Sequence, residues 1–170
     1  MTAGADSGTI RAPVAAHAAP AFTLLGPRTE SRLPGAILPH VQAVILCDHI
    51  YRDEDSGKCV IAGTFNRVFL QDFPGSYQPA SIYLNLSDFS GQHSIAFRFK
   101  RLADETILDQ SRSFDLIHED RREHHECIFD LPPLHFPEPG RYTLEIVYDD
   151  DDVIGHADVE AQQLPEPEPE

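Results

Sequence analysis

The sequence has no tryptophan and a single methionine among its 170 residues. Apolar residues make up 41% of the chain, so Phe, Leu, Ile and Val must fill any core. No run approaches the ~20 apolar residues that a membrane-spanning helix needs. The N-terminus lacks a basic segment followed by an apolar one, so we expect no signal peptide. We therefore expect a cytoplasmic protein.

Basic residues are scarce, with 13 Lys and Arg against 28 Asp and Glu, which gives a formal net charge of −15. Residues 149–170 hold nine of these acids and no Lys or Arg. Binding to nucleic acids depends mainly on Lys and Arg that neutralise phosphates. We therefore expect a protein partner and neither a nucleic acid nor an anionic membrane.

Cysteine occurs three times, at Cys47, Cys59 and Cys127, so the three cannot all pair within the chain. Each lies in an apolar, strand-like run, where a free thiol behaves as a small hydrophobic group. The sequence favours reduced thiols and a reducing compartment. A bridge between Cys47 and Cys59 remains the alternative.

The sequence is rich in the signals of short β-strands and turns. Val41–Tyr51 and Lys58–Ala62 are β-rich runs separated by a polar segment that ends in Gly57, a pattern typical of a β-hairpin. Apolar and polar residues then alternate in several further segments, which predicts strands with one buried face. These segments are 81–87, 94–100, 126–131, 141–148 and 153–161.

No segment keeps the helical period over three turns, and 14 prolines and 10 glycines favour turns. Parallel strands need long crossovers, usually helices. We therefore predict an all-β fold of seven to nine antiparallel strands, an immunoglobulin-like β-sandwich rather than a small barrel. The predicted domain covers residues 38–163. Residues 1–37 are expected to be disordered or loosely docked, with Phe22–Leu25 as their one apolar island, and 164–170 form an acidic Pro/Glu tail without structure.

Two acidic turns are candidates for a calcium site. Asp149–Asp152 and Asp53–Asp55 would supply hard carboxylate ligands if both turns lay at one end of the sandwich. The alternative is two solvated hairpin turns, in which Asp is a favoured turn residue.

A second candidate is the charged stretch around residues 118–126. Zinc needs three or four converging ligands, and a turn at 120–123 would be required to bring the histidines together. The alternative is an exposed polar loop or a frayed strand edge. If the chain were an enzyme of unrecognised type, His118, His124 and His125 would be the first residues to mutate. The candidate cluster comprises His118, Glu119, Asp120, His124, His125 and Glu126.

The sequence contains no Gly-x-Ser-x-Gly elbow and no glycine-rich phosphate loop. Asp48 lies within an apolar strand, so we expect a structural role in which it accepts hydrogen bonds from turn amides or from Arg67. We assign no catalytic, cofactor-binding or metal residue. The sequence favours a non-enzymatic binding or scaffolding module, with a calcium- or lipid-linked sandwich as the alternative.

Two resemblances support this fold. The segment Pro139-Gly140-Arg141-Tyr142 resembles the entry into a late strand of immunoglobulin-like sandwiches, which implies that Tyr142 bonds back to the backbone as a tyrosine corner. More broadly, Leu46-Cys47-Asp48, Asp53-Glu54-Asp55, Ala62-Gly63-Thr64-Phe65 and Phe73-Pro74 resemble a bacterial family of uncharacterised domains over about residues 41–159. That resemblance implies a fold and a bacterial origin, with no activity.

Overall fold

The computed structural model describes residues 38–150 and 152–165, and all their regular structure is β-strand. The described residues form no helix, so none that could cross a membrane. The strands are β1 His40–Arg52, β2 Cys59–Thr64, β3 Arg67–Leu70, β4 Gly75–Tyr77, β5 Ser81–Ser87, β6 Gly91–Arg101, β7 Ile107–Gln110, β8 Phe114–His118, β9 His125–Asp130, β10 Leu134–Phe136, β11 Gly140–Tyr148 and β12 Asp152–Gln163.

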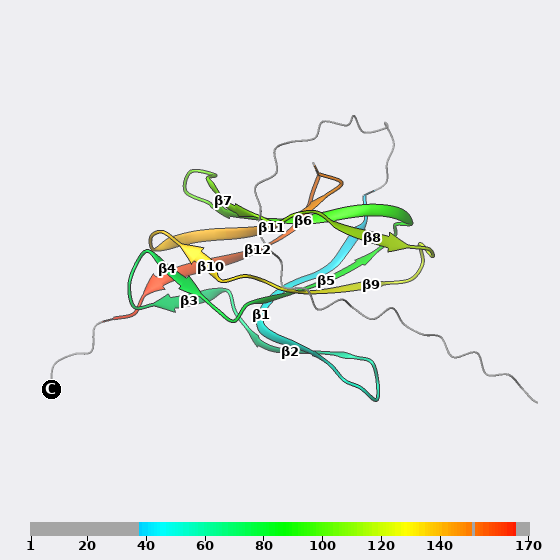
Figure 1. The fold of residues 1–170 in the computed structure, drawn as a ribbon, viewed down its shortest axis with the longest axis horizontal. Helices are drawn as coiled ribbons and strands as arrows, with labels where there is room; N and C mark the ends of the chain where they lie inside the picture. The colour runs from blue at the N-terminus through cyan, green and yellow to red at the C-terminus, as the bar shows by residue number, and fades with distance from the viewer. Residues whose placement is uncertain (1–37, 151, 166–170) are drawn as a thin grey trace, which may run out of the picture.

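Two larger sheets form two layers (Figure 1). One has the order β2-β1-β5-β9, and the other has the order β3-β12-β11-β6-β7, with β8 also paired to β6. The short strands β10 and β4 make a separate pair. Among residues 38–150 and 152–165 none of these sheets closes on itself, which fits a sandwich-like arrangement rather than the barrel alternative.

The core lies between the two layers and is built from the alternating rows that the sequence predicts. The inward residues of β5, β6 and β11 are all buried in one cluster, and each such side chain stabilises the fold by roughly 1.5–3 kcal/mol. They are Ile82, Leu84, Leu86, Ile95, Phe97, Phe99, Tyr142, Leu144, Ile146 and Tyr148.

One strand pair departs from the predicted antiparallel pattern. β3 runs parallel to β12, with Arg67 opposite Glu160 and Leu70 opposite Gln163. The two strands are far apart in the sequence, so the intervening strands β4–β11 take the place of the crossover helix. The prediction failed because it considered only a helical connection.

The structure also has more strands than the predicted seven to nine, since twelve are described. β4 and β10 have three residues each and pair with one another, from Leu134 opposite Tyr77 to Phe136 opposite Gly75. Three residues are too few to show an alternating pattern. Their pairing depends on tertiary contacts, which the sequence pattern does not display.

A β-bulge changes which residues of β12 face the core. The register shifts because Ile146 lies opposite Gly155 while Val147 lies opposite Val153, so Ile154 is the extra residue. Ile154 packs against the core, and Val153 is 47% exposed. Strict alternation over residues 153–161 would place Val153 on the same face as the buried Val159, whereas the inserted residue turns Val153 to the opposite face.

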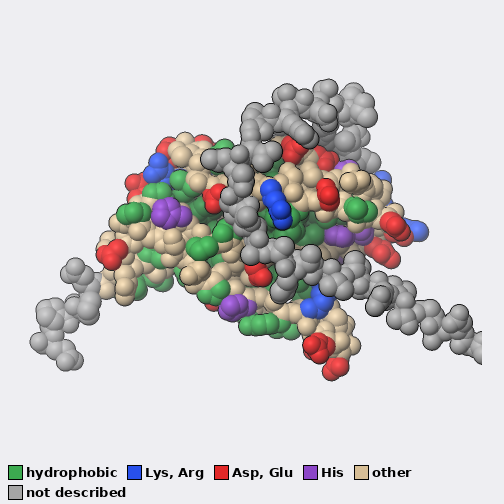
Figure 2. Space-filling view, viewed as in Figure 1, with side chains coloured by type: hydrophobic (Ala, Val, Ile, Leu, Met, Phe, Trp, Pro, Cys, Tyr) green, Lys and Arg blue, Asp and Glu red, His purple; other side chains and the backbone are tan. Residues whose placement is uncertain are grey.

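The hairpin of β1 and β2 extends away from the two layers (Figure 1). Tyr51 and Val60 lie opposite each other on it and are 56% and 51% exposed. Figure 2 shows acidic side chains at its tip. The predictions for residues 1–37, including Phe22–Leu25, and for 166–170 lie outside the described residues, and the boundaries 38–163 stay a prediction.

Candidate functional site

Two histidines of the predicted cluster meet between β8 and β9. The Nδ1 atoms of His118 and His125 are 3.2 Å apart, and His118 Nε2 lies 3.1 Å from the carbonyl oxygen of Glu123. A carbonyl only accepts, so Nε2 of His118 carries the hydrogen and its Nδ1 accepts from His125 when both rings are neutral. Phe89 stacks on His118 with ring centroids 4.8 Å apart. His118 is buried as a result, although an exposed loop or frayed edge was predicted.

The other members of that cluster point elsewhere. His124 Nδ1 lies 3.2 Å from Oδ1 of Asn85, and Glu126 accepts a hydrogen bond from the Tyr83 hydroxyl. Successive strand residues face opposite sides of a sheet, so Glu126 cannot share a site with His125. Asp120 bonds to the backbone and side chain of Arg122. Among the described residues, no group of three or more His, Cys, Asp or Glu side chains could hold a metal ion.

The two acidic turns lie apart. The tip of the β1–β2 hairpin and the β11–β12 turn are on opposite sides of the molecule (Figure 1). Asp53 caps its own turn through the backbone and hydroxyl of Ser56. Asp149 bonds to the Ser94 amide and to His93, 2.8 Å away. These separate partners favour the interpretation of two hairpin turns rather than one calcium site, and Asp151 lies outside the described residues.

The three cysteines are free and lie in different environments. The Cys47 thiol donates to the Ser81 carbonyl, and Cys59 contacts a Glu126 oxygen. Cys47 lies opposite Thr64 and Cys59 opposite Arg52, so the alternative bridge between them does not fit the register. Burial raises the pKa of Cys127 to about 12, as expected for an inert core thiol.

Asp48 has the structural role that the sequence predicts, with a different partner. The Tyr77 hydroxyl donates to its Oδ1 over 2.7 Å, whereas Arg67 pairs with Glu160. Burial and the bond to Asp48 raise the pKa of Tyr77 to about 12. Gly63 lies against the Asp48 carboxylate at φ +70°, where a side chain would collide with it. No sequence pattern marks Tyr77 as the partner.

A cleft in the described surface lies where the chain changes sheets. After Thr64 at the end of β2, Phe65 and Asn66 carry the chain across to β3 in the other sheet. The crossing leaves a cleft of about 430 Å³ beside β1 and β12. Its lining residues are Val44, Ile45, Leu46, Thr64, Phe65, Asn66, Ala157 and Asp158. This volume lies within the range of ligand sites, roughly 300–1,000 Å³.

The cleft is bordered by strand edges that lack a neighbouring strand in the described residues. β1 pairs with β2 only from Cys47 onward, so the part of β1 before Cys47 has no neighbouring described strand on that side. In the same way, β12 pairs with β3 only from Glu160 onward, and the part of β12 before Glu160 has no neighbouring described strand on that side. The Leu46 carbonyl accepts from Phe65, and the Glu160 amide donates to Asn66. Backbone groups two residues apart point to the same edge. The backbone amide and carbonyl groups of Val44 and Asp158, each two residues earlier in its strand, therefore face the cleft.

Close packing of the two layers sets the closed end of the cleft. A Cβ on Gly155 of β12 would lie 3.1 Å from a Val44 methyl and 3.5 Å from a Val41 methyl. The two layers therefore meet at Gly155 and separate toward Asn66. The sequence gives no direct signal of this cleft, apart from the break in alternation at Phe65-Asn66.

A family model matches residues 42–157, more than half of the chain. The chain belongs to this family of unknown function, DUF6941. The predicted resemblance to a family of uncharacterised domains is thereby confirmed. The matched part of the DUF6941 chain includes the lining of the cleft as far as Ala157. No curated protein matches the chain.

Proposed function

We propose that this chain is a non-enzymatic protein-binding module that takes up an extended segment of a partner protein in the cleft between β1 and β12. The observation that carries the proposal is the pair of strand edges, at Val44 and Asp158, that border an open cleft without a neighbouring strand in the described residues. Unpaired edges bind extended peptides by adding a strand, where backbone hydrogen bonds supply affinity and side-chain pockets supply specificity.

The chemistry of the cleft defines the partner segment. Val44 and Phe65 are half-buried and offer apolar contact at one wall, while the rest of the exposed lining is mostly polar. These contacts suit a segment bound chiefly through its backbone, with apolar residues at the alternate positions that face this wall. Asp158 lies on the lining and is partly exposed, with Arg141 as a weak ion-pair partner 3.5 Å away. The chain also has a net charge of −15. We therefore expect basic residues flanking the apolar positions of the partner.

The finer parts of the proposal concern fold type and location. An immunoglobulin-like sandwich is supported by the bond from Tyr142 to the Glu138 carbonyl, 2.6 Å long, as in a tyrosine corner. Free thiols at all three cysteines support a reducing compartment such as the cytoplasm. The acidic surface supports a protein partner rather than nucleic acid or an anionic membrane. Bacterial origin rests on the family resemblance of the sequence.

A library of nine-residue peptides displayed on phage, selected against the full chain, tests the proposal. We expect enriched peptides that alternate apolar residues between basic flanks. A synthetic copy with N-methyl groups on the amides that face the edge should bind at least tenfold more weakly, because it cannot donate to the strand. Asp158→Lys should weaken binding by a similar factor. Glu119→Lys is the matched control, since it makes the same charge change at an exposed turn residue.

Three results would overturn the proposal. The first is a selection that enriches no peptide. The second is equal binding of the N-methylated copy, or equal loss with Asp158→Lys and Glu119→Lys. The third is slow hydrogen exchange of the Val44 amide in the free full-length chain, because another part of the chain or a second copy would then already cover this edge.

A further inference from the structure

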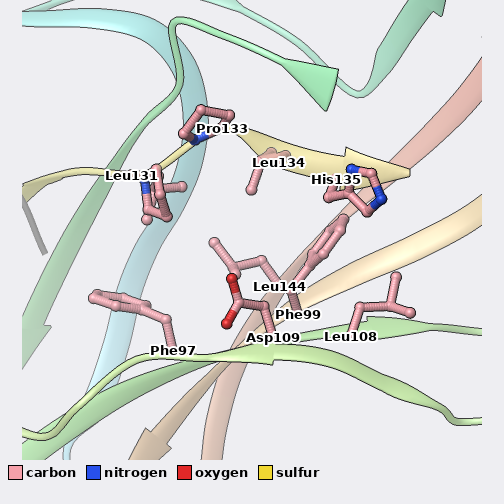
Figure 3. A pocket seen from close by; sticks show the side chains of 10 residues that line it. Phe97, Phe99, Leu108, Asp109, Leu131, Pro133, Leu134, His135 and Leu144 are labelled. Atoms are coloured by element: carbon pink, nitrogen blue, oxygen red, sulfur yellow. The ribbon is translucent and has the colours of Figure 1, made fainter. Parts of the chain in front are cut away.

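A small apolar cavity opens beside β7, separate from the cleft between β1 and β12. Its volume is about 50 Å³, and its walls come from β6, β7, β11 and the segment that leads into β10 (Figure 3). The floor consists of Phe97, Phe99 and Leu144, which are 2–3% exposed. Leu131 and Leu134 close the opposite side. The cavity would be an ordinary packing gap if its lining were wholly apolar.

One wall carries a carboxylate that faces inward. Asp109 lies opposite Phe99 in the register of β6 and β7, and directly paired strand residues share a face, so Asp109 points to the core side of the sheet. Lys100 lies opposite Ile107, which makes Leu108 the extra residue of a β-bulge. Bulges re-aim side chains in this way near binding sites. In Figure 3 the Asp109 carboxylate points in among Phe97, Phe99 and Leu144.

This carboxylate has no cationic partner among the residues that line the cavity. The one hydrogen bond it accepts in the described part of the chain comes from the backbone of Gln110, over 2.8 Å. The described residues that line the cavity include no Lys or Arg, and His135, the other titratable residue there, bonds to Ser76. Burial raises the pKa of Asp109, as expected for a carboxylate that lacks a compensating charge.

We propose that this cavity binds the primary ammonium end of an aliphatic chain. The ammonium group would pair with Asp109, and the apolar side chains of the lining, among them Phe97, Leu131 and Leu144, would contact the methylene groups. A volume of about 50 Å³ holds a few heavy atoms, well below the roughly 300 Å³ of a site for a whole small molecule. The cavity therefore takes the tip of a chain, which either a free alkylamine or a lysine side chain supplies.

Titration of the full chain with n-butylammonium chloride, followed by methyl NMR, tests the proposal. We expect saturable shifts of the Leu108, Leu131 and Leu134 methyls at millimolar concentrations. n-Butanol, which has the same chain without the charge, should bind at least tenfold more weakly. Asp109→Asn should reduce ammonium binding at least tenfold, and Asp115→Asn, which removes an exposed acid from the adjacent strand β8, should leave it unchanged.

A second variant and a second ligand complete the test. Leu131→Phe narrows the cavity while keeping Asp109, and it should also abolish binding. N-acetyl-lysine-methylamide distinguishes the two sources of the ammonium group: binding tenfold tighter than butylammonium assigns a lysine side chain, and weaker binding assigns a free alkylamine.

The proposal fails if butanol binds as tightly as butylammonium, or if Asp109→Asn binds as tightly as the wild type. It also fails if Asp109→Asn retains ammonium binding but forms concentration-dependent oligomers. β7 is the edge strand of its sheet, and an inward acid on an edge strand can serve to prevent pairing between molecules. That result would assign Asp109 to such a protective role.

Discussion

The Tyr142 hydroxyl donates a hydrogen bond to the Glu138 carbonyl, 2.6 Å away and four residues earlier in the chain. Tyr142 is fully buried, so its ring anchors the start of β11 in the core while its hydroxyl fixes the turn before that strand. The bond joins a local turn to the tertiary core.

Replacement of this hydroxyl should measure what the bond contributes. Tyr142→Phe keeps the ring packing and should lower the free energy of unfolding by about 1–2 kcal/mol, as expected for a buried hydrogen bond. Tyr51→Phe is the control, because Tyr51 is 56% exposed and its change should stay within about 0.5 kcal/mol. Urea denaturation of both variants gives the comparison. Equal effects would mean that the Tyr142 bond contributes nothing.

Gly57 and Gly63 offer a matched pair for backbone strain and steric conflict. Both have positive φ, +68° and +70°, but only Gly63 is crowded, by the Asp48 carboxylate. Gly57→Ala should cost about 1–2 kcal/mol from strain alone. Gly63→Ala should lower the free energy of unfolding by at least about 1 kcal/mol more than Gly57→Ala does, because the new methyl group displaces the Asp48 carboxylate from the Tyr77 hydroxyl. In an Asp48→Ala background the extra cost should fall, because the carboxylate is removed and only the Cβ of residue 48, at 3.0 Å, remains. An unchanged extra cost would contradict the steric explanation.

Asp109 should make stability depend on pH in the opposite sense to a paired acid. The pKa of Asp109 is raised in the folded state, so the folded protein releases this proton less readily than the unfolded chain does. The resulting loss of folding stability is absent below the ordinary pKa of about 3.9 and develops as pH rises through the raised value. Asp109→Asn should therefore stabilise the protein at pH 7, by less than about 1 kcal/mol after solvent screening, with no gain at pH 3. Thermal unfolding at both pH values measures this.

Asp104 provides the control for that sign. Its pKa is lowered by the bond from Arg101, so Asp104→Asn should destabilise the protein at pH 7 and have less effect at low pH. If both substitutions changed stability in the same direction at pH 7, the assigned environment of Asp109 would be wrong.

The His118–His125 pair should weaken the fold in mild acid. Burial and the charge of His118 lower the pKa of His125, so the unfolded chain binds a proton at His125 more readily than the folded protein does. The folding stability that depends on a neutral His125 ring is therefore present above pH 6.5, and it is lost as pH falls through the lowered pKa of His125. His125→Asn keeps a donor toward His118 but cannot titrate. It should show a smaller loss of stability than the wild type between pH 7.5 and 5.5, by up to about 1 kcal/mol.

Urea unfolding of both proteins at the two pH values checks this prediction. His124→Asn is the control, because His124 is exposed and bonds to Asn85 on the other face of the sheet. An unchanged pH dependence in His125→Asn would show that this pair does not couple protonation to folding.

Local patterns predicted much of the sheet structure. Alternation placed Ile82, Leu84 and Leu86 inward, and the structure buries all three. The motif around Tyr142 predicted its bond to the preceding turn. These features depend on neighbours within a few residues, which is why the sequence displays them.

Features that depend on register or on distant strands were not predictable. The bulge at Ile154 reverses the faces of β12, and the bulge at Leu108 turns Asp109 inward, yet neither has a sequence signal. His118 and His125 meet because β8 and β9 are placed by their pairing with other strands. An additional residue in one strand is invisible until its partner strand is known.

The sequence by itself determined that this chain builds layers of short strands around rows of Ile, Leu and Phe, because a period of two is a local property of the backbone. Only the tertiary structure decided which strands became neighbours, where β1 and β12 have edges without a neighbouring strand among the described residues, and where Asp109 faced an apolar cavity. The physical reason is that strand pairing joins residues far apart in the chain. Its register depends on the combined packing of both layers rather than on any one segment.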